Sequence, residues 1–582
     1  MFKRLNSRRW LVLVVLMLIL AACGTTDSTD TEEPDAGEDA PVAQPTSADT
    51  EVTEEMEGTE EVEEEDSMQG GTVIVGHRQE PDRLWRPITG LVASNEIAAL
   101  VNHTLIGIDE NLDYFPILLE QVPALENGTV SEDGLTWTLN LRDDVLWHDG
   151  EQFTSADVRF TWEVMVMEGT DVLSSVGWNR ITSVDTPDDF TAVLNFSEID
   201  APFLNRLAIV QILPEHILGG MSAEEMMGNE WFRAPIGTGP FRFVEWVSGS
   251  HIEVERFDDY FIEGQPHLDR VIYSIVSDAN TLLNQLETGE VDIVLRLQDD
   301  QVEIADGIPG IETITVQSLT PWLLMINVND PILSDVRTRQ ALSHGMDREF
   351  INREVYRGLS EPAFGPVSPQ LAAYNPDIPK FTYDPEQAAA LLTEVGWIDE
   401  DGDGIREAHG VEGVEDGTPF HVEIANIAGE QIRVQLLSLV QAQWQEVGID
   451  AELNLVDVGT LFGDMLPNNN FQISYSFIGR NVDPDFGSLY LDRDRYENRS
   501  NYMGYSNERV DELILCTQTT VDVAERSQCF AEAQQIIAEE VPQIFIGWRA
   551  NTTGINERVQ GYKPTPGWDE MWNAAEWWVT DN

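Results

Sequence analysis

Hydrophobic and polar positions follow two different periods along the chain. Residues 135–142 alternate as in a half-buried strand, and residues 271–276 form an apolar run typical of a buried strand. Residues 279–288 have the spacing of a helix, and residues 291–295 form the next short apolar run. This strand–helix–strand order predicts parallel strands and an α/β fold.

The second half of the chain repeats the same order. Asp384 and Pro385 predict the start of a helix, and Gly396 predicts its end. The other elements predicted here are strands at 421–427 and 451–456 and helices at 431–447 and 522–540. We therefore expect two α/β lobes.

Two further apolar segments, residues 318–329 and 543–551, are predicted to cross between these lobes. Two lobes joined by crossovers enclose a cleft, and a cleft that opens and closes can trap a ligand.

Length and charge narrow the function classes. A chain of 582 residues needs two or three domains. The formal net charge of −71 would repel nucleic acid and anionic lipid headgroups, so neither is an expected partner. The negative charge has two alternative interpretations: it keeps the protein soluble, or it favours the binding of cationic ligands.

The first seventy residues predict export and a tether. Residues 1–22 combine a basic start with a short apolar run, as a secretory signal peptide does. Leu20-Ala21-Ala22-Cys23 resembles the lipobox of bacterial lipoproteins, which implies lipidation of Cys23. Residues 24–69 hold 18 acidic and no basic residues, so residues 23–69 are predicted to form a disordered tether.

The chain holds five longer blocks of note, at residues 134–165, 235–243, 339–369, 383–397 and 501–514. In this order, they resemble the family 5 extracellular solute-binding proteins of ABC transporters. The resemblance implies a periplasmic-binding-protein-like two-lobe fold (type II, cluster C) with a small domain inserted in the first lobe. It also implies solute capture by hinge closure, without catalysis.

The expected domain boundaries follow from this resemblance. Residues 70–320 form lobe 1, with domain II inserted at about 109–225. Residues 321–545 form lobe 2, and residues 546–582 return to lobe 1.

The loop 477–485 resembles a segment of the peptide binders in which an Asp pairs with the free α-amine of the peptide. Arg480 occupies the place of that Asp, followed by Asn481 and Asp483. A guanidinium binds carboxylates and cannot accept hydrogen bonds from an ammonium. Either Asp483 or Asp485 substitutes, or the ligand differs, or Arg480 pairs with a neighbouring carboxylate.

Other candidate ligand contacts are aromatic or polar residues near the expected cleft. Trp322 and Asn327 lie on the first crossover, Tyr502 precedes a helix, and Trp85 follows the first strand. Each of them is equally consistent with a place in the core.

Cysteines and acidic clusters suggest two structural features. Cys516 and Cys529 are predicted to form a disulfide, because an exported protein meets an oxidising compartment. Asp399, Asp401 and Asp403 resemble the start of a calcium loop, but Gly410 stands where a bidentate Glu is needed. An acidic surface turn is the alternative, and no cofactor is expected.

The sequence thus predicts a monomeric, lipid-anchored receptor at the outer face of the cytoplasmic membrane or in the periplasm. It would deliver peptides or peptide-like solutes to the permease subunits of an ABC importer. Oligosaccharides or an anionic small molecule are alternative ligands, and a secreted hydrolase is a distant alternative. No nucleophile motif such as G-x-S-x-G supports an enzyme.

Overall fold

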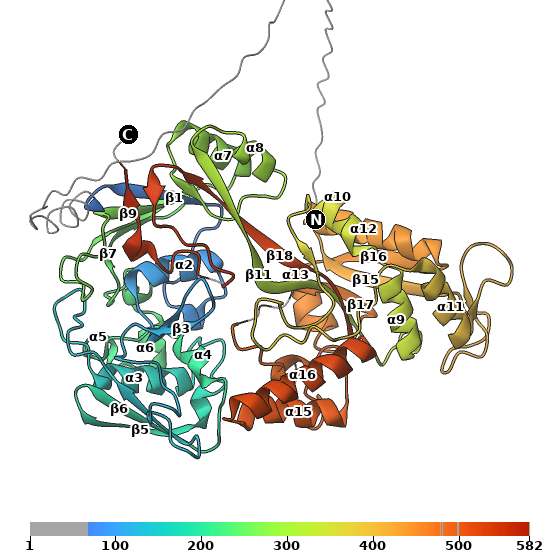
Figure 1. Ribbon diagram of the computed structural model, residues 1–582, viewed down its shortest axis with the longest axis horizontal. Coiled ribbons are helices and arrows are strands. Elements are labelled where there is room, and N and C mark those ends of the chain that lie inside the picture. Colours follow the sequence, from blue (N-terminus) through green and yellow to red (C-terminus); the bar gives the residue numbers. More distant parts are fainter. Residues whose placement is uncertain (1–67, 478, 480, 497–499, 568, 581–582) are drawn as a thin grey trace, which may run out of the picture. The chain divides into compact units, whose positions relative to one another are not determined.

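The computed structural model describes residues 68–477, 479, 481–496, 500–567 and 569–580 (Figure 1). The predictions for the signal peptide, for Cys23, for the tether up to residue 67 and for Arg480 lie outside these residues. Within the described part, no helix combines the length and the apolar composition needed to cross a membrane.

One large mixed sheet runs through both lobes. Its strand order is β16-β15-β17-β11-β18-β10-β1-β9-β8-β7, with β12 also paired to β18. At the first-lobe end the elements are β1 (Thr72–His77), β7 (Phe241–Val247), β8 (His251–Arg256), β9 (Arg270–Ile275), β10 (Ile293–Val294), η1 (Arg86–Ile88), α2 (Val92–Val101), α7 (Ala279–Thr288) and α8 (Val302–Asp306).

The predicted parallel order is confirmed here, with one difference. β9 and β10 are connected by α7, yet they do not pair with each other, because β1 lies between them and is parallel to both. The N-terminal strand therefore occupies the middle of this lobe. The helix α7 ends at Gly289, whose φ of 73° is the left-handed conformation that glycine adopts readily.

A smaller unit is inserted between α2 and β7. Its elements are β2 (Ile106–Ile108), β3 (Tyr114–Pro116), β4 (Thr136–Asn140), α3 (Ser155–Val166), η2 (Trp178–Arg180), β5 (Ile181–Asp188), β6 (Thr191–Phe196), α4 (Phe203–Leu207), α5 (Glu215–Leu218), α6 (Ala223–Met227) and η3 (Glu230–Phe232). The antiparallel sheet β4-β6-β5 packs with α3 around its own apolar core, which includes Trp137, Trp147 and Phe203.

The second lobe covers the other end of the large sheet. It contains α9 (Val336–His344), α10 (Arg348–Val355), β12 (Glu361–Pro362), α11 (Pro385–Val395), β13 (Trp397–Ile398), β14 (Glu407–Ala408), β15 (His421–Ile427), α12 (Gln431–Glu446), β16 (Asp450–Val456), α13 (Val458–Thr460), η4 (Leu461–Met465), β17 (Ile473–Phe477), α14 (Gly487–Tyr490), α15 (Glu508–Thr519) and α16 (Val523–Glu540). Trp397 and Trp444 are fully buried in its core.

Two long antiparallel strands connect the lobes. β11 (Ile311–Ile326) and β18 (Gln543–Asn556) pair from Ile311 opposite Asn556 to Met325 opposite Gln543, with an irregularity between Gln317 and Pro321. In Figure 1 they run from one group of elements to the other. The chain then ends in β19 (Val559–Gln560), η5 (Ala574–Glu576) and β20 (Trp578–Val579) beside the first lobe, where Trp577 is fully buried.

Candidate ligand-binding cavities along the crossover strands

A cavity of about 560 Å³ lies beside the crossover strands, and we call it the main cavity. Residues of both lobes line it. The first lobe contributes His77, Arg78, Gln79, Val92, Arg296, Leu297, Gln298 and Asp299; the crossovers contribute Trp322, Arg549, Ala550 and Asn551; the second lobe contributes Tyr356, Ser360, Glu430, Ile432, Arg433, Tyr475 and Phe477.

Aromatic rings form one wall of the main cavity. Trp322 on β11 stacks on Tyr356 at a centroid distance of 6.3 Å and an interplanar angle of 3°. It stacks on Tyr475 at 5.9 Å and meets Phe477 edge-on at 5.7 Å. The register of β11 against β17 places Trp322 opposite Phe477, so the strand pairing itself assembles this wall. Such a wall can pack against a flat or apolar ligand group.

Two arginines lie over this aromatic wall. The guanidinium of Arg433 is 5.8 Å from the ring centroids of Tyr475 and Phe477, and that of Arg549 is 5.5 Å from Trp322. Burial lowers the pKa of Arg549 to about 10, because desolvation disfavours its charge. At neutral pH Arg549 therefore remains a cation.

A buried ionic cluster supports the first-lobe side of the main cavity. Arg296 lies 3.0 Å from Glu570 and 3.8 Å from Glu96, which is fully buried. The hydroxyl of Tyr273 donates to Glu96 at 3.2 Å. Burial and the negative charge of Glu570 raise the pKa of Glu96 well above its usual range. The cluster thus links α2, β9, the end of β10 and the C-terminal segment.

Asp299 is the half-buried carboxylate of the main cavity. Burial raises its pKa to about 6, although the positive charge of Arg549 opposes that shift. Asp299 can therefore take up a proton in mildly acidic solution.

A second cavity, of about 100 Å³, lies near β11, at Leu319. Its lining includes Arg86, Phe115, Asn481, Asp569 and Trp572. A narrow cavity of about 10 Å³ shares Arg296, Arg549 and Asn551 with the main cavity and Gly567 with the second one.

The structure brings some of the predicted contacts to these cavities. Trp322 lines the main cavity, and Asn481 lines the second one. Asp483 instead forms an ion pair with Arg526 at 2.6 Å, and burial raises its pKa. Its carboxylate is thus already neutralised by a side chain of α16.

The other three predicted contacts are absent from the described residues that line either cavity. Trp85 is fully buried, and its indole N–H donates to the carbonyl of Gln211 at 2.9 Å. Asn327 donates to the carbonyls of Asn469 and Phe471 at 3.1 and 3.0 Å. Tyr502 packs against the core of the second lobe. All three hold the fold together at these positions.

Sequence reasoning missed Arg296, Tyr356, Arg433, Tyr475 and Arg549. Arg549 lies within the predicted crossover 543–551, where a charged residue in an otherwise apolar strand was a usable signal. The other four gave no local signal, because only the tertiary fold brings them to one cavity.

Cys516 of α15 and Cys529 of α16 form a disulfide, with their Cα atoms 6.2 Å apart. Their helices pack in the second lobe, and neither cysteine is among the residues that line the two cavities.

Two groups of side chains have the geometry of cation ligands among the described residues. Asp399, Asp401 and Asp403 are exposed, and their carboxylates accept hydrogen bonds from backbone N–H groups of the same loop. This acidic turn needs no ion to explain its form.

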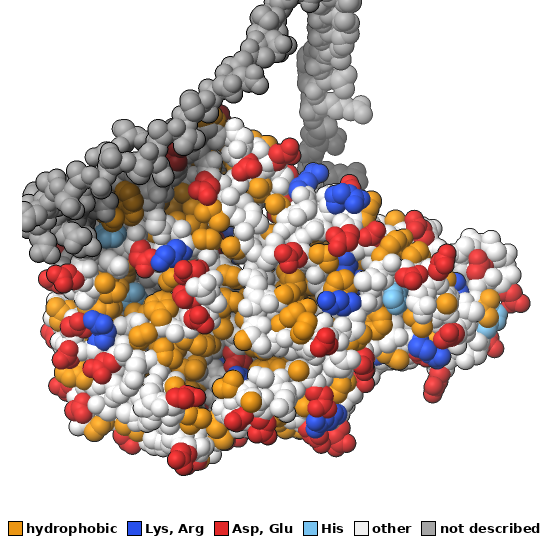
Figure 2. Space-filling model, in the orientation of Figure 1, with side chains coloured by type: hydrophobic (Ala, Val, Ile, Leu, Met, Phe, Trp, Pro, Cys, Tyr) orange, Lys and Arg blue, Asp and Glu red, His pale blue; other side chains and the backbone are white. Residues whose placement is uncertain are grey.

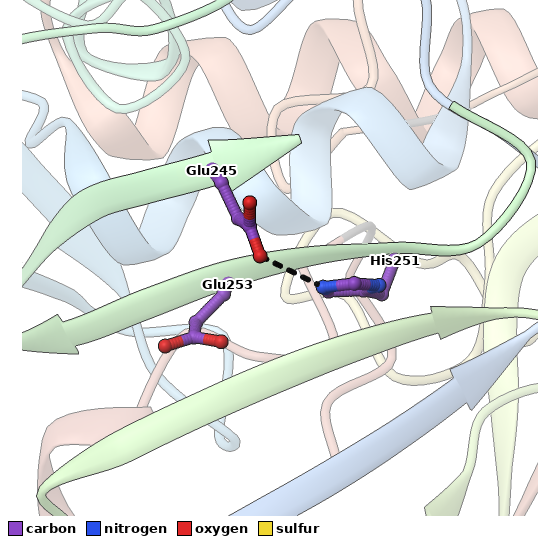
Figure 3. Close-up of side chains that lie close together, drawn as sticks. All are labelled: Glu245, His251 and Glu253. Atoms are coloured by element: carbon purple, nitrogen blue, oxygen red, sulfur yellow. Dashed lines mark hydrogen bonds and ion pairs between the residues drawn. The ribbon is translucent and has the colours of Figure 1, made fainter. Parts of the chain in front are cut away.

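The other group lies on the β7–β8 hairpin. Figure 3 shows Glu245 pointing toward His251, with a carboxylate–imidazole distance of 3.3 Å. Glu253 is 3.0 Å from Arg270. These contacts account for the group, which the sequence gave no reason to single out because Glu245 reaches the others across strands.

Known proteins share both sequence and fold with this chain. Residues 120–499 match the model of the family described as bacterial extracellular solute-binding proteins, family 5 Middle. The oligopeptide-binding protein AppA of Bacillus subtilis (strain 168) is 30% identical over 516 residues, which are 88% of this chain and 92% of that protein. The dipeptide-binding protein of Escherichia coli (strain K12) is 27% identical over 77% of this chain and 84% of its own length.

Among solved structures, AppA of Bacillus subtilis in complex with a nonapeptide has a TM-score of 0.73. It is 29% identical and covers 88% of this chain and 100% of its own. The likeness therefore extends over both lobes and the crossovers.

Proposed function

Because the chain belongs to the bacterial extracellular solute-binding proteins of family 5, we propose that it captures peptides outside the cytoplasm for an ABC importer. The solute would enter the main cavity and leave it unchanged, at the permease subunits. Relatives named as oligopeptide- and dipeptide-binding proteins support this choice of ligand.

The main cavity is the observation that carries the proposal. It lies beside the two strands that connect the lobes, and both lobes contribute side chains to it. Its volume of about 560 Å³ lies within the roughly 300–1,000 Å³ usual for ligand pockets, so it has room for a short peptide. Bending of β11 and β18 would bring the aromatic wall toward the first lobe and enclose the solute.

We extend the proposal to the organisation of the whole chain. Lobe 1 would comprise residues 70–320 and 546–582, with the inserted domain at about 109–225, and lobe 2 residues 321–545. The signal peptide and Cys23 would give a monomeric receptor anchored by lipid at the cell envelope. Trp322 and Asn481 would contact the solute from the two cavities.

A second candidate ligand is an anionic small molecule with a flat group. The stacked rings around Trp322 and the arginines above them favour it.

Isothermal titration of the full chain with peptides of two to nine residues tests the main proposal. Binding of one or more peptides at micromolar or tighter dissociation constants is the expected result. Failure of every peptide, together with mass-spectrometric recovery of a non-peptide solute from the purified protein, would replace peptides by the second candidate.

A further inference from the structure

Arg549 is a half-buried cation that has neither a hydrogen-bond partner nor an ion-pair partner among the described residues. It lies on β18 where the pairing with β11 is irregular, and it lines both the main cavity and the narrow one. Its guanidinium lies over the ring of Trp322 at 5.5 Å. Within the described part of the chain, it makes no hydrogen bond and has no carboxylate oxygen within 4.0 Å.

This lack of a partner is unusual for this composition. The chain has 104 acidic and 33 basic residues, so a carboxylate could easily have been placed beside Arg549. The five N–H donors of a guanidinium are costly to leave unsatisfied when they are partly withdrawn from water. A partner supplied from outside the chain would remove that cost.

The nearby carboxylates are already engaged or lie too far away. Glu570 and Glu96 pair with Arg296, and Glu430 lies 3.4 Å from Arg433. Asp299 shares the cavity but forms no ion pair with Arg549 within 4.0 Å. Arg296 adds a second positive charge near Arg549, which strengthens the attraction for an anion.

We infer that Arg549 binds a carboxylate of the solute, and that the main cavity selects solutes with a free carboxylate next to a group that packs on Trp322. This inference rests on the proposed function and names its substrate class. A guanidinium holds a carboxylate through two parallel hydrogen bonds, while its face stays on the indole. Arg433, over Tyr475 and Phe477 in the second lobe, places a further cation on the same wall.

Three matched peptides distinguish the possible sources of the carboxylate. The probes are Ala-Phe-Ala-Ala with a free C-terminus, the same peptide as its C-terminal amide, and Ala-Phe-Glu-Ala amide, titrated calorimetrically into the full chain. We expect the free acid to bind roughly 10- to 100-fold more tightly than the first amide. If the glutamate peptide binds as tightly as the free acid, a side-chain carboxylate serves Arg549 as well as the C-terminus does. If it binds as weakly as the first amide, the C-terminal carboxylate is the partner of Arg549.

Variants of Arg549 test the residue itself. Arg549→Gln should abolish the preference for the acid, and Arg549→Lys should restore only part of it, because an ammonium lacks the two-pronged geometry. Arg353→Gln is the matched control, since Arg353 is exposed and pairs with Glu354 away from the main cavity. Circular dichroism checks that each variant folds.

Two outcomes would overturn the inference while peptide capture stands: equal binding of acid and amide by the unaltered chain, or an unchanged preference in Arg549→Gln. If no peptide binds, the proposal of peptide capture fails. The inference about Arg549 is then tested by comparing the thermal unfolding midpoint of the full chain in phenylacetate with that in phenylacetamide. Phenylacetate should stabilise the unaltered chain more than phenylacetamide does, and this difference should vanish in Arg549→Gln. Equal shifts in the unaltered chain would sink the inference as well.

Discussion

Trp322 illustrates how one side chain joins packing and recognition. It stacks on Tyr356 and Tyr475 from a crossover strand and is only half-buried, so part of its ring faces the main cavity. Trp322→Ala should lower solute affinity about tenfold and the free energy of unfolding by about 2 kcal/mol, because ring contacts are lost in both. Calorimetry and urea unfolding measure the two effects. Trp322→Phe should keep most of the affinity. Full affinity in the alanine variant would show that Trp322 contributes to packing and not to solute binding.

Glu96 makes stability depend on pH through a proton that the folded state retains. Burial raises its pKa in the folded protein, whereas the unfolded chain releases that proton near pH 4.5. Its contribution to stability is therefore fully present below about pH 4.5 and is lost as the pH rises toward the folded pKa. Glu96→Gln should lose less stability than the unaltered chain between pH 5 and 8, since an amide has no proton to release.

Urea unfolding at several pH values in that window tests this expectation. The exposed Glu303→Gln variant is the control, and it should keep the pH slope of the unaltered chain. Identical slopes for Glu96→Gln and the unaltered chain would show that residue 96 carries no proton-linked stability.

At the scale of elements, the disulfide between α15 and α16 stabilises a helix pair rather than the cavity. Its sequence separation of 13 residues corresponds to a contribution of about 3 kcal/mol by loop-closure entropy. Replacing Cys516 and Cys529 together by serine should lower the urea midpoint and leave solute affinity unchanged, because neither residue lines the cavities. A large loss of affinity in the folded double variant would contradict this separation.

Local signals predicted the ends of elements well. The helix α11 begins after Asp384 with Pro385 and ends at Gly396, as expected. The Asp384 carboxylate accepts a hydrogen bond from the N–H of Gln387. The lengths of β11 and β18 were predicted less well. The predicted crossovers were 318–329 and 543–551, whereas both strands continue farther into the first lobe. That extension depends on their pairing with each other, over a separation in sequence that no local pattern reports.

The residues of the candidate site could likewise be predicted from the sequence only in part. A tryptophan on a crossover could be predicted at a cavity, and Trp322 lies there. Asn327 looked equally suitable, but its amide binds backbone carbonyls 142 and 144 residues away. The sequence shows Arg549 as a charged residue on an apolar crossover, but its lack of an ion-pair partner could be found only from the structure, because that is a property of its three-dimensional surroundings.

At the scale of the whole molecule, charge imbalance is the dominant electrostatic feature. Acidic side chains are spread over the described face in Figure 2, and the formal net charge is −71. Surface ion pairs contribute only about 0–1 kcal/mol each, and 33 basic residues cannot pair with 104 acidic ones. Salt screens both the repulsion between unpaired carboxylates and the attraction within ion pairs. The stability gained from weaker repulsion should exceed the stability lost from weaker attraction.

Raising NaCl from 0.02 to 0.5 M should thus raise the thermal unfolding midpoint, because the screening length falls below about 10 Å above 0.1 M. Differential scanning calorimetry of the full chain measures the midpoint, with sorbitol at matched osmolality as the uncharged control. The rise should exceed that in sorbitol and should level off once screening is complete. A midpoint that falls with NaCl would mean that the ion pairs, such as those of Arg296 and Arg526, stabilise the fold more than the excess of carboxylates destabilises it.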